Sequence, residues 1–286
     1  MMRWRNHPYI RLMRFDKPIG TFLLLWPTLW ALWLASEGQP DPHLLLIFVA
    51  GVIIMRAAGC VINDIADRKV DGKVKRTAQR PLATGEISTK QAVALFLTLI
   101  LAAFALVLLL DWNTIALSVV ALFLAALYPF MKRYTHLPQV FLGMAFGWAI
   151  PMVYMASMGS IPVEAWLLFI ANICWVLAYD TMYAMVDYED DIKVGIKSTA
   201  VLFAQYCPFW ISLFQVLFIV LMIQVGFFYT LGVFYFSALF LALILSLYQQ
   251  RLIQLGQREF YFKAFLNNNV LGAVIFLGLF LDYTFS

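Results

Sequence analysis

Nine apolar runs, each long enough to cross the hydrocarbon core of a bilayer, follow one another along the chain. Hydrophobic residues make up 63% of the 286 residues and charged residues only 13%, which is more apolar surface than one soluble core could bury. The expected spans are residues 19–35, 44–62, 92–110, 114–130, 138–157, 163–186, 209–226, 229–248 and 268–285. The sequence therefore predicts an all-α membrane protein, in which residues 1–286 form one polytopic domain of about nine transmembrane helices.

The basic residues are divided unequally between the two sides of this predicted bundle. All but one of the 20 lysine and arginine residues fall in the N-terminal segment or in alternate loops, and the exception, Arg56, lies inside the second span. Because short cytoplasmic loops carry an excess of Lys and Arg, the N-terminus is predicted to be cytoplasmic and the C-terminus to lie on the opposite side. The same division argues against nucleic-acid binding, for which the net charge of +4 would be gathered in one basic patch.

The cysteines and histidines show no spacing typical of a disulfide framework or a zinc site. They are Cys60, Cys174, Cys207, His7, His43 and His136. The cysteines lie in or beside apolar stretches, and the histidines are far apart in the sequence. Any metal is therefore expected to have oxygen ligands.

Local signals predict how two helices begin, pack and bend. Ser88 and Gln91 have the spacing of a capping box at the start of the third span. Gly143 and Gly147 allow close helix packing in the fifth span, and Pro151 predicts a kink there.

A first acidic motif ends the second span and opens the cytoplasmic segment 63–90. Asn63, Asp67 and Asp71 recur every four residues, so on a helix they project from one face within reach of a shared cation. Asp64 points elsewhere on such a helix and is expected to be solvated.

A second acidic motif ends the sixth span and opens the cytoplasmic segment 187–200. Asp187 and Asp191 form the same i,i+4 pair, and Asp190 points to nearly the same side. Glu189 is expected to be solvated, whereas Asp180 lies two turns earlier, inside the span.

Two clusters of carboxylates on one membrane face call for cations between them, because like charges repel near a low-dielectric region. Mg²⁺ suits these short pairs, since it is usually held by one or two carboxylates together with substrate phosphates. Each pair alone could instead be a solvated helix end. A weak internal repeat, Asp67-Arg-Lys-Val against Asp191-Ile-Lys-Val, favours a shared function at the repeat interface.

Three basic residues are candidates for binding anions. Arg56 lies two turns before Asn63 inside a span, where its guanidinium needs an anion such as a carboxylate; a structural pair with Asp180 is the alternative. Lys132 and Arg133 could bind a diphosphate, although topology alone also demands basic residues there.

Three consecutive asparagines, residues 267–269, are predicted at the start of the ninth span. They would serve either as a helix cap or as polar contacts for a substrate.

These motifs resemble the two signatures of the UbiA family of intramembrane prenyltransferases. The first is Asn63-Asp64-x-x-Asp67-x-x-x-Asp71, followed by Arg76-x-x-x-Arg80-Pro-Leu-x-x-Gly. The second runs Tyr179-Asp180-Thr-x-Tyr183-Ala-Met-x-Asp187-x-x-Asp190-Asp191. Together with Tyr128-Pro-Phe-Met-Lys-Arg-Tyr-Thr-His-Leu-Pro-Gln139, they look like the branch of the family that prenylates 4-hydroxybenzoate. The likeness runs from about Arg11 to the C-terminus.

The resemblance implies a helical bundle around a chamber open to the cytoplasm and laterally to lipid, in a bacterial inner membrane. It implies transfer of a polyprenyl group from polyprenyl diphosphate to C3 of 4-hydroxybenzoate, an early step of ubiquinone biosynthesis. Asp67, Asp71, Asp187 and Asp191, with Asn63, would hold Mg²⁺ ions that grip the diphosphate.

By the same resemblance, Arg68, Lys132 and Arg133 would help to neutralise the diphosphate. Arg56 would bind the acceptor carboxylate, and Asp180 would orient the acceptor or assist proton loss.

Alternatives of other kinds are a divalent-cation or metabolite transporter, and a lipid phosphotransferase that uses an activated nucleotide. A transporter explains the aspartates less well, because the charged motifs all belong to the cytoplasmic half of the predicted spans. Prenyl length and oligomeric state do not follow from the sequence, and residue spacing alone does not separate 4-hydroxybenzoate from homogentisate, a naphthoate or a porphyrin side chain.

Overall fold

The computed structural model describes residues 6–68, 71–73 and 77–285, and within these ranges every regular element is a helix. The N-terminal half contains α1 (Pro8–Leu12), α2 (Ile19–Ala35), α3 (Pro42–Asp67), a 3₁₀ turn (Asp71–Lys73), α4 (Thr89–Val107) and α5 (Trp112–Tyr134). Then come α6 (Pro138–Gly147), α7 (Ala149–Met158), α8 (Val163–Val194), α9 (Thr199–Phe203), a second 3₁₀ turn (Ala204–Tyr206), α10 (Cys207–Phe228), α11 (Val233–Gln254) and α12 (Arg258–Phe285). Within the predicted cytoplasmic segment 63–90, residues 69–70 and 74–76, which include Arg76 of the first signature, lie outside the described residues.

The predicted spans correspond to the long helices of the bundle. Eight helical segments of the described chain are long and apolar enough to cross a membrane, with α6 and α7 forming one crossing and α9 and α10 another. α2 is apolar but has only 17 residues, at the short end of the range for a transmembrane helix. The prediction of an all-α, multi-pass membrane protein with about nine helices is confirmed, since the described chain has eight to nine apolar helices.

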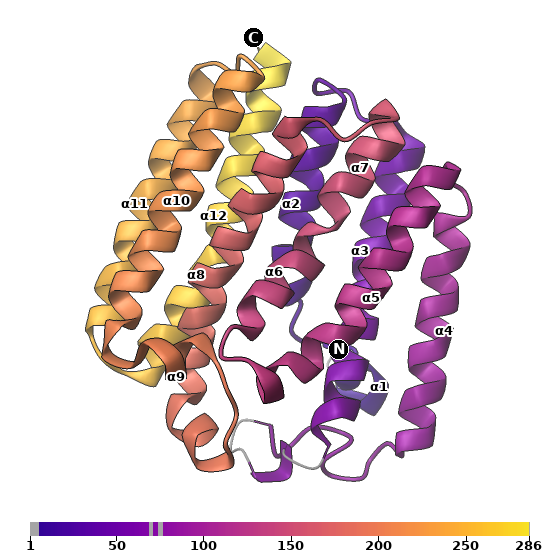
Figure 1. Cartoon of the computed structure of the whole chain (residues 1–286), viewed down its shortest axis with the longest axis vertical. Helices are drawn as coiled ribbons and strands as arrows, with labels where there is room; N and C mark the ends of the chain where they lie inside the picture. The colour runs from indigo at the N-terminus through magenta and orange to yellow at the C-terminus, as the bar shows by residue number, and fades with distance from the viewer. Residues whose placement is uncertain (1–5, 69–70, 74–76, 286) are drawn as a thin grey trace.

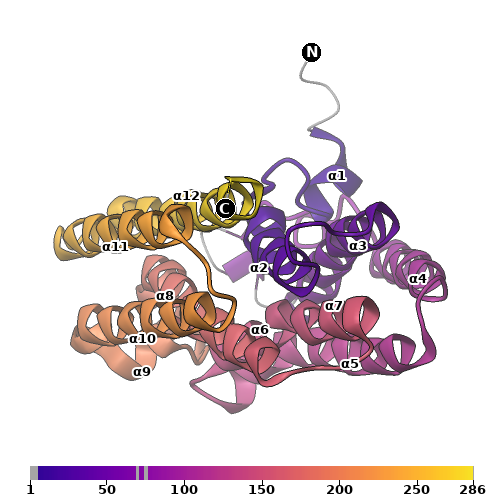
Figure 2. The ribbon, with the colours of Figure 1, turned by 90° about the horizontal axis from the view of Figure 1, so that it is seen from above.

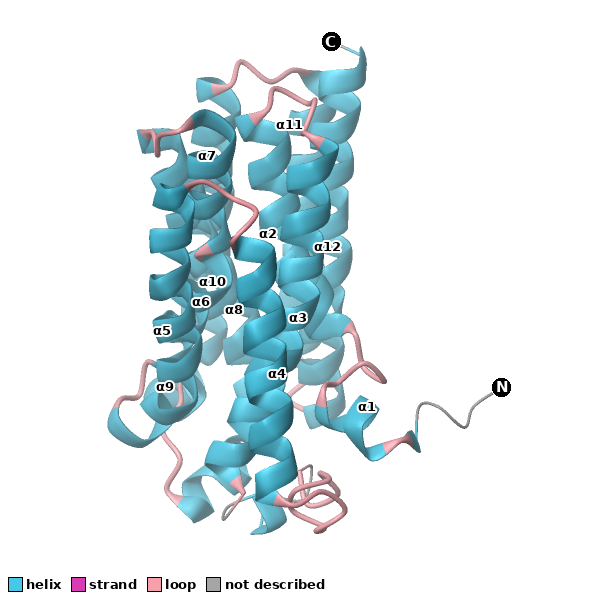
Figure 3. Ribbon diagram, turned by 90° about the vertical axis from the view of Figure 1, so that its right-hand side faces the viewer, coloured by secondary structure: helices cyan, strands magenta, loops and turns pink. Residues whose placement is uncertain are grey.

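The long helices run side by side along one axis (Figure 1). Seen from above, α11, α12, α2 and α3 form one row and α10, α8, α6, α7 and α5 a second, with α4 at one end of the two rows (Figure 2). α1 and the loop that joins α3 to α4 lie at one end of the bundle, and the C-terminus lies at the other (Figure 3). Both acidic motifs belong to the end that holds α1, because each ends a helix there.

Capping and helix-breaking residues begin and bend the helices largely as predicted. Ser88 and Gln91 form the capping box at the start of α4, with each side chain bonded to the backbone of the other residue. The fifth span divides at Trp148 into α6 and α7. Because Pro151 has no N–H, the carbonyl of Gly147 loses its helical partner at this break.

The three asparagines 267–269 lie inside α12, so the capping interpretation is wrong. Asn268 accepts a hydrogen bond from the Trp175 indole at 2.9 Å, and Asn269 accepts one from the Trp26 indole at 2.9 Å. These bonds tie α12 to α8 and α2, because buried polar groups in a membrane bundle need partners on neighbouring helices.

Gly143 brings α6 against α8, as the spacing with Gly147 predicted. A β-carbon at residue 143 would lie 3.1 Å from the Cα atom of Ile173, which is backbone and cannot move alone. We expect Gly143→Leu to lower the free energy of unfolding by about 1–3 kcal/mol, because the larger side chain must push the two helices apart. The midpoint of thermal unfolding in detergent measures this change, and an unchanged midpoint would contradict the close-packing role.

Candidate active site

A central cavity of about 1120 Å³ runs between the helices and collects most of the predicted site residues. Its wall is charged near the ends of α3 and α8 that carry the acidic motifs. Farther along the bundle its wall is apolar, with Phe48 from α3, Phe104 from α4 and Leu122 from α5. The cavity therefore joins a polar compartment to an apolar arm.

The first acidic motif lies at the polar end of this cavity. Asn63 and Asp67 line it from the last two turns of α3, and Asp71 lines it from the 3₁₀ turn that follows. Asp67 is buried and pairs with the ammonium group of Lys132 through one carboxylate oxygen. Its other oxygen, Oδ1, is buried without a hydrogen-bond partner among the described residues.

Asp64 corrects the prediction of a solvated side chain, because it is fully buried. Arg14 and Arg80 each place a guanidinium nitrogen 3.0 Å from Asp64 Oδ1. Arg80 also lies 2.9 Å from an oxygen of Asp71, so one ion-pair network joins the N-terminal segment to the first motif. Burial raises the pKa of Asp71, and the positive charge of Arg80 opposes that rise.

The second acidic motif lies across the same cavity. Asp187 and Asp191 are buried on the face of α8 that lines it. Asp190 and Glu189 turn toward Arg258, which donates to Glu189 at 2.8 Å. The expectation that Glu189 is solvated is confirmed, since its side chain is 70% exposed.

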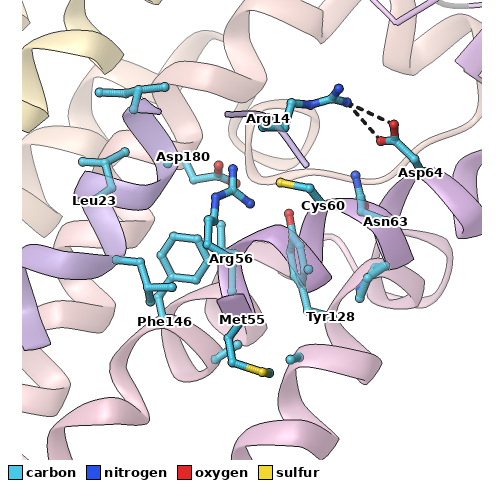
Figure 4. A pocket seen from close by; sticks show the side chains of 18 of the residues that line it. Arg14, Leu23, Met55, Arg56, Cys60, Asn63, Asp64, Tyr128, Phe146 and Asp180 are labelled. Atoms are coloured by element: carbon cyan, nitrogen blue, oxygen red, sulfur yellow. Dashed lines mark hydrogen bonds and ion pairs between the residues drawn. The ribbon is translucent and has the colours of Figure 1, made fainter. Parts of the chain in front are cut away.

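A smaller compartment surrounds Arg56, deeper in the cavity than Asn63. The guanidinium lies 5.8 Å from the centre of the Phe146 ring, a distance typical of a cation–π contact. In Figure 4, Arg56 and Asp180 point toward one another and Tyr128 points into the same space. The hydroxyl of Tyr179, a neighbour in the cavity wall, is buried without a hydrogen-bond partner among the described residues.

Two predicted anion ligands lie apart from the cavity. Arg68 is exposed and donates to the carbonyl of Ile65 at 2.8 Å. Arg133 is also exposed and donates to the carbonyl of Ala66 at 2.6 Å. Both arginines thus bond to the backbone of the last turn of α3, where positive charge stabilises a helix C-terminus.

Arg14 and Arg80 line the cavity although the sequence suggested no individual role for either. Arg14 could be counted only as one more basic residue of the N-terminal segment. Its position depends on an unusual backbone, because its φ of +61° is rare for a residue with a side chain. Arg80 stood within a family-like motif, which was the one available signal.

The donors at the polar end suit a divalent cation shared with an anionic ligand. Carboxylate and amide oxygens are the ligands that hard cations prefer, and the buried, unpartnered Oδ1 of Asp67 is one such donor. The described residues hold no ready-made cluster of three acidic, histidine or cysteine side chains around one point. Asp67 and Asp71 reach Lys132 and Arg80 instead, so a cation here would need further oxygens from its ligand.

Comparison with known proteins places this arrangement in context. Residues 24–276 match the UbiA prenyltransferase family. A relative from Pseudoalteromonas translucida, 4-hydroxybenzoate octaprenyltransferase, is 59% identical over 275 residues, which are 96% of this chain and 94% of the relative. The protein of the same name from Methylococcus capsulatus is 57% identical over 282 residues, which cover 99% and 97% of the two chains.

Solved structures share the fold. A UbiA homolog from Aeropyrum pernix K1 has a TM-score of 0.82 and 26% identity, with coverage of 92% of this chain and 98% of that one. A UbiA homolog from Archaeoglobus fulgidus, bound to GPP and Mg²⁺, has a TM-score of 0.75 and 16% identity, with coverage of 97% and 99%. At that identity the second likeness shows the fold alone.

Proposed function

This chain belongs to the UbiA prenyltransferase family, and we propose that it transfers a polyprenyl group from a polyprenyl diphosphate to C3 of 4-hydroxybenzoate in a Mg²⁺-dependent reaction. The observation that carries the proposal is one cavity that holds both acidic motifs, a cluster of basic side chains and a long apolar arm. Relatives at 57–59% identity over nearly the whole chain bear the name of that activity.

The polar end of the cavity suits the diphosphate of the donor. Lys132, Arg14 and Arg80 bring positive charge to the wall there, and the apolar arm offers space for the prenyl chain. Bound Mg²⁺ ions, held by Asn63, Asp67 and Asp71 on one side and by Asp187 and Asp191 on the other, would supply further neutralisation of the leaving diphosphate.

The reaction breaks the bond between C1 of the prenyl chain and the diphosphate oxygen, and the electron pair leaves with the oxygen. Lys132 and Arg80 stabilise the negative charge that develops on the diphosphate, which discourages its return to the allylic cation. Tyr128 and Phe146 line the same cavity, and their rings would help to shield that cation from water.

The compartment around Arg56 suits the acceptor. Its guanidinium would bind the carboxylate of 4-hydroxybenzoate, and Asp180 would orient the ring or accept the proton that C3 loses when the new carbon–carbon bond forms. The product is 3-polyprenyl-4-hydroxybenzoate, an intermediate of ubiquinone biosynthesis.

We further propose that the end of the bundle with both acidic motifs faces the cytoplasm of a bacterial cell, with the chain in the inner membrane. The arginines and lysines gather in the N-terminal segment and in loops at that end, which supports this orientation.

The test is transfer of a radiolabelled prenyl group from its diphosphate to 4-hydroxybenzoate by detergent-purified protein, with and without Mg²⁺. A metal-dependent prenylated product is expected. Folded protein that gives no product with any of several donor lengths would overturn the acceptor assignment. Mg²⁺ flux across proteoliposomes without a lipid diphosphate would favour a transporter instead.

Arg56→Ala is expected to raise the KM for 4-hydroxybenzoate by about 10- to 100-fold, because a charge-assisted hydrogen bond to a carboxylate is lost. The KM for the prenyl diphosphate should stay close to the wild-type value. Initial rates with each substrate varied in turn measure the two constants. Equal losses for donor and acceptor would assign Arg56 to a structural pair with Asp180.

A further inference from the structure

We infer that Gly20 is a positioning residue for the acceptor: the bare backbone of α2 at this point lets the Arg56 guanidinium occupy the place from which it binds the acceptor carboxylate. This inference rests on the proposed function, because it concerns the same compartment. Gly20 lies in the first turn of α2, is buried and lines the central cavity.

The spacing between Gly20 and Arg56 leaves no room for a side chain. A β-carbon at residue 20 would lie 2.2 Å from Nη2 of Arg56, 2.5 Å from Nε and 2.7 Å from Cζ. All three distances are far below ordinary van der Waals contact, and all three atoms belong to the guanidinium group. Glycine at residue 20 is therefore required for this position of the Arg56 head group.

The guanidinium is held from a second direction. Phe146 of α6 presents its ring 5.8 Å from Cζ of Arg56, and Figure 4 shows Phe146 beside the Arg56 side chain. The head group thus lies between α2 and α6, turned toward Asp180. Nε of Arg56 is buried without a hydrogen-bond partner among the described residues, so the fork retains a donor that an anionic ligand could use.

A need for close packing between helix backbones does not explain Gly20. The three heavy atoms nearest to its added β-carbon belong to the Arg56 side chain, whereas at Gly143 the nearest atom is the backbone Cα of Ile173. The long Arg56 side chain can swing aside when a methyl group is added, and alanine is a better helix former than glycine. We therefore expect Gly20→Ala to keep the fold and to move the guanidinium.

The experiment compares Gly20→Ala with the wild type in the detergent-purified enzyme. We expect the KM for 4-hydroxybenzoate to rise about tenfold, with the KM for the prenyl diphosphate within about twofold of wild type, because only the carboxylate-binding group moves. The midpoint of thermal unfolding should not fall. An unchanged acceptor KM in a folded variant would overturn the inference.

A double-mutant cycle separates positioning from a general effect on the cavity. Arg56→Lys removes the guanidinium that the methyl group would strike, so Gly20→Ala should add little to the acceptor KM in that background. Additive effects of the two substitutions would contradict the inference.

Gly51→Ala provides the matched control. This substitution adds the same methyl group to a helical glycine of the cavity wall, but the new β-carbon meets no atom within 4 Å. We expect the KM of this variant for 4-hydroxybenzoate to match the wild type. A rise equal to that of Gly20→Ala would contradict the positioning role of Gly20. If Arg56→Ala left the KM for 4-hydroxybenzoate unchanged, the proposed function would be contradicted. If Arg56→Ala raised this KM but Gly20→Ala did not, only the role of Gly20 would be contradicted.

Discussion

Asp187→Ala is expected to reduce prenyl transfer by about 10³-fold, because it removes a carboxylate that we propose as a ligand of the cation that stabilises the departing diphosphate. Asp187 is buried on the cavity face of α8, whereas the other carboxylates of that turn, Glu189 and Asp190, pair with Arg258. The rate of product formation at saturating donor and acceptor measures the loss. Asp187→Asn keeps the shape of the side chain and should lose most of the activity as well, which separates the charge from the packing.

Glu189→Ala is the matched control for Asp187. Glu189 lies two residues along the same helix, is exposed and pairs with Arg258, outside the proposed metal-binding positions. An exposed ion pair contributes little to stability, so this variant should retain wild-type turnover. Wild-type turnover in Asp187→Ala would show that Asp187 does not hold the cation.

Asp64→Ala should lower the free energy of unfolding by about 2–4 kcal/mol, because Arg14 and Arg80 lose the buried carboxylate that they share. The side chain of Asp64 is 1% exposed, whereas those of Arg14 and Arg80 are 23% and 13% exposed, so solvent compensates only part of the loss. Transfer activity should fall too, since Arg80 also orients Asp71. The midpoint of thermal unfolding in detergent and the rate of product formation measure the two effects.

Glu86→Ala tests whether this loss in the free energy of unfolding is specific to the buried ion pairs of Asp64. Glu86 accepts a hydrogen bond from Arg11 at 2.8 Å, so it also ties the N-terminal segment to the loop before α4, but its side chain is 36% exposed. We expect a change of no more than about 1 kcal/mol. If Asp64→Ala were no more destabilising than Glu86→Ala, the buried ion pairs of Asp64 would not contribute more to stability than an exposed pair does.

The fold could be predicted closely because its signals are local. A run of apolar residues must be helical in a bilayer, where each backbone polar group needs a partner within the chain, and loops must carry the charges. The helix α2 begins and ends where the apolar run 19–35 does. The three asparagines show the limit: hydropathy predicts that they open a span, whereas α12 begins at Arg258, because the more polar turns before the apolar run also join the helix.

The candidate site could be predicted only as far as helical periodicity reaches. The four-residue spacing correctly placed Asn63 and Asp67 on one face of α3, whereas Asp71 reaches the same cavity from the 3₁₀ turn after that helix has ended. For Asp64 the same reasoning predicted a solvated side chain. Helical periodicity gives the direction of a side chain but not which distant residues lie on that side. Arg68 and Arg133, both expected to reach the diphosphate, bond instead to backbone carbonyls at the end of α3.

The sequence by itself determined that this chain crosses a membrane many times and that its acidic motifs lie where two helices end at one end of the bundle, and it predicts oxygen ligands for any bound metal. These properties depend on hydropathy, charge and spacing within single segments. The tertiary structure alone decided the partners: Arg14 with Asp64, Lys132 with Asp67, and the guanidinium of Arg56 against Gly20. Each of these contacts joins residues at least 36 positions apart, as Gly20 and Arg56 are, and such distant contacts depend on how whole helices pack together rather than on any local pattern.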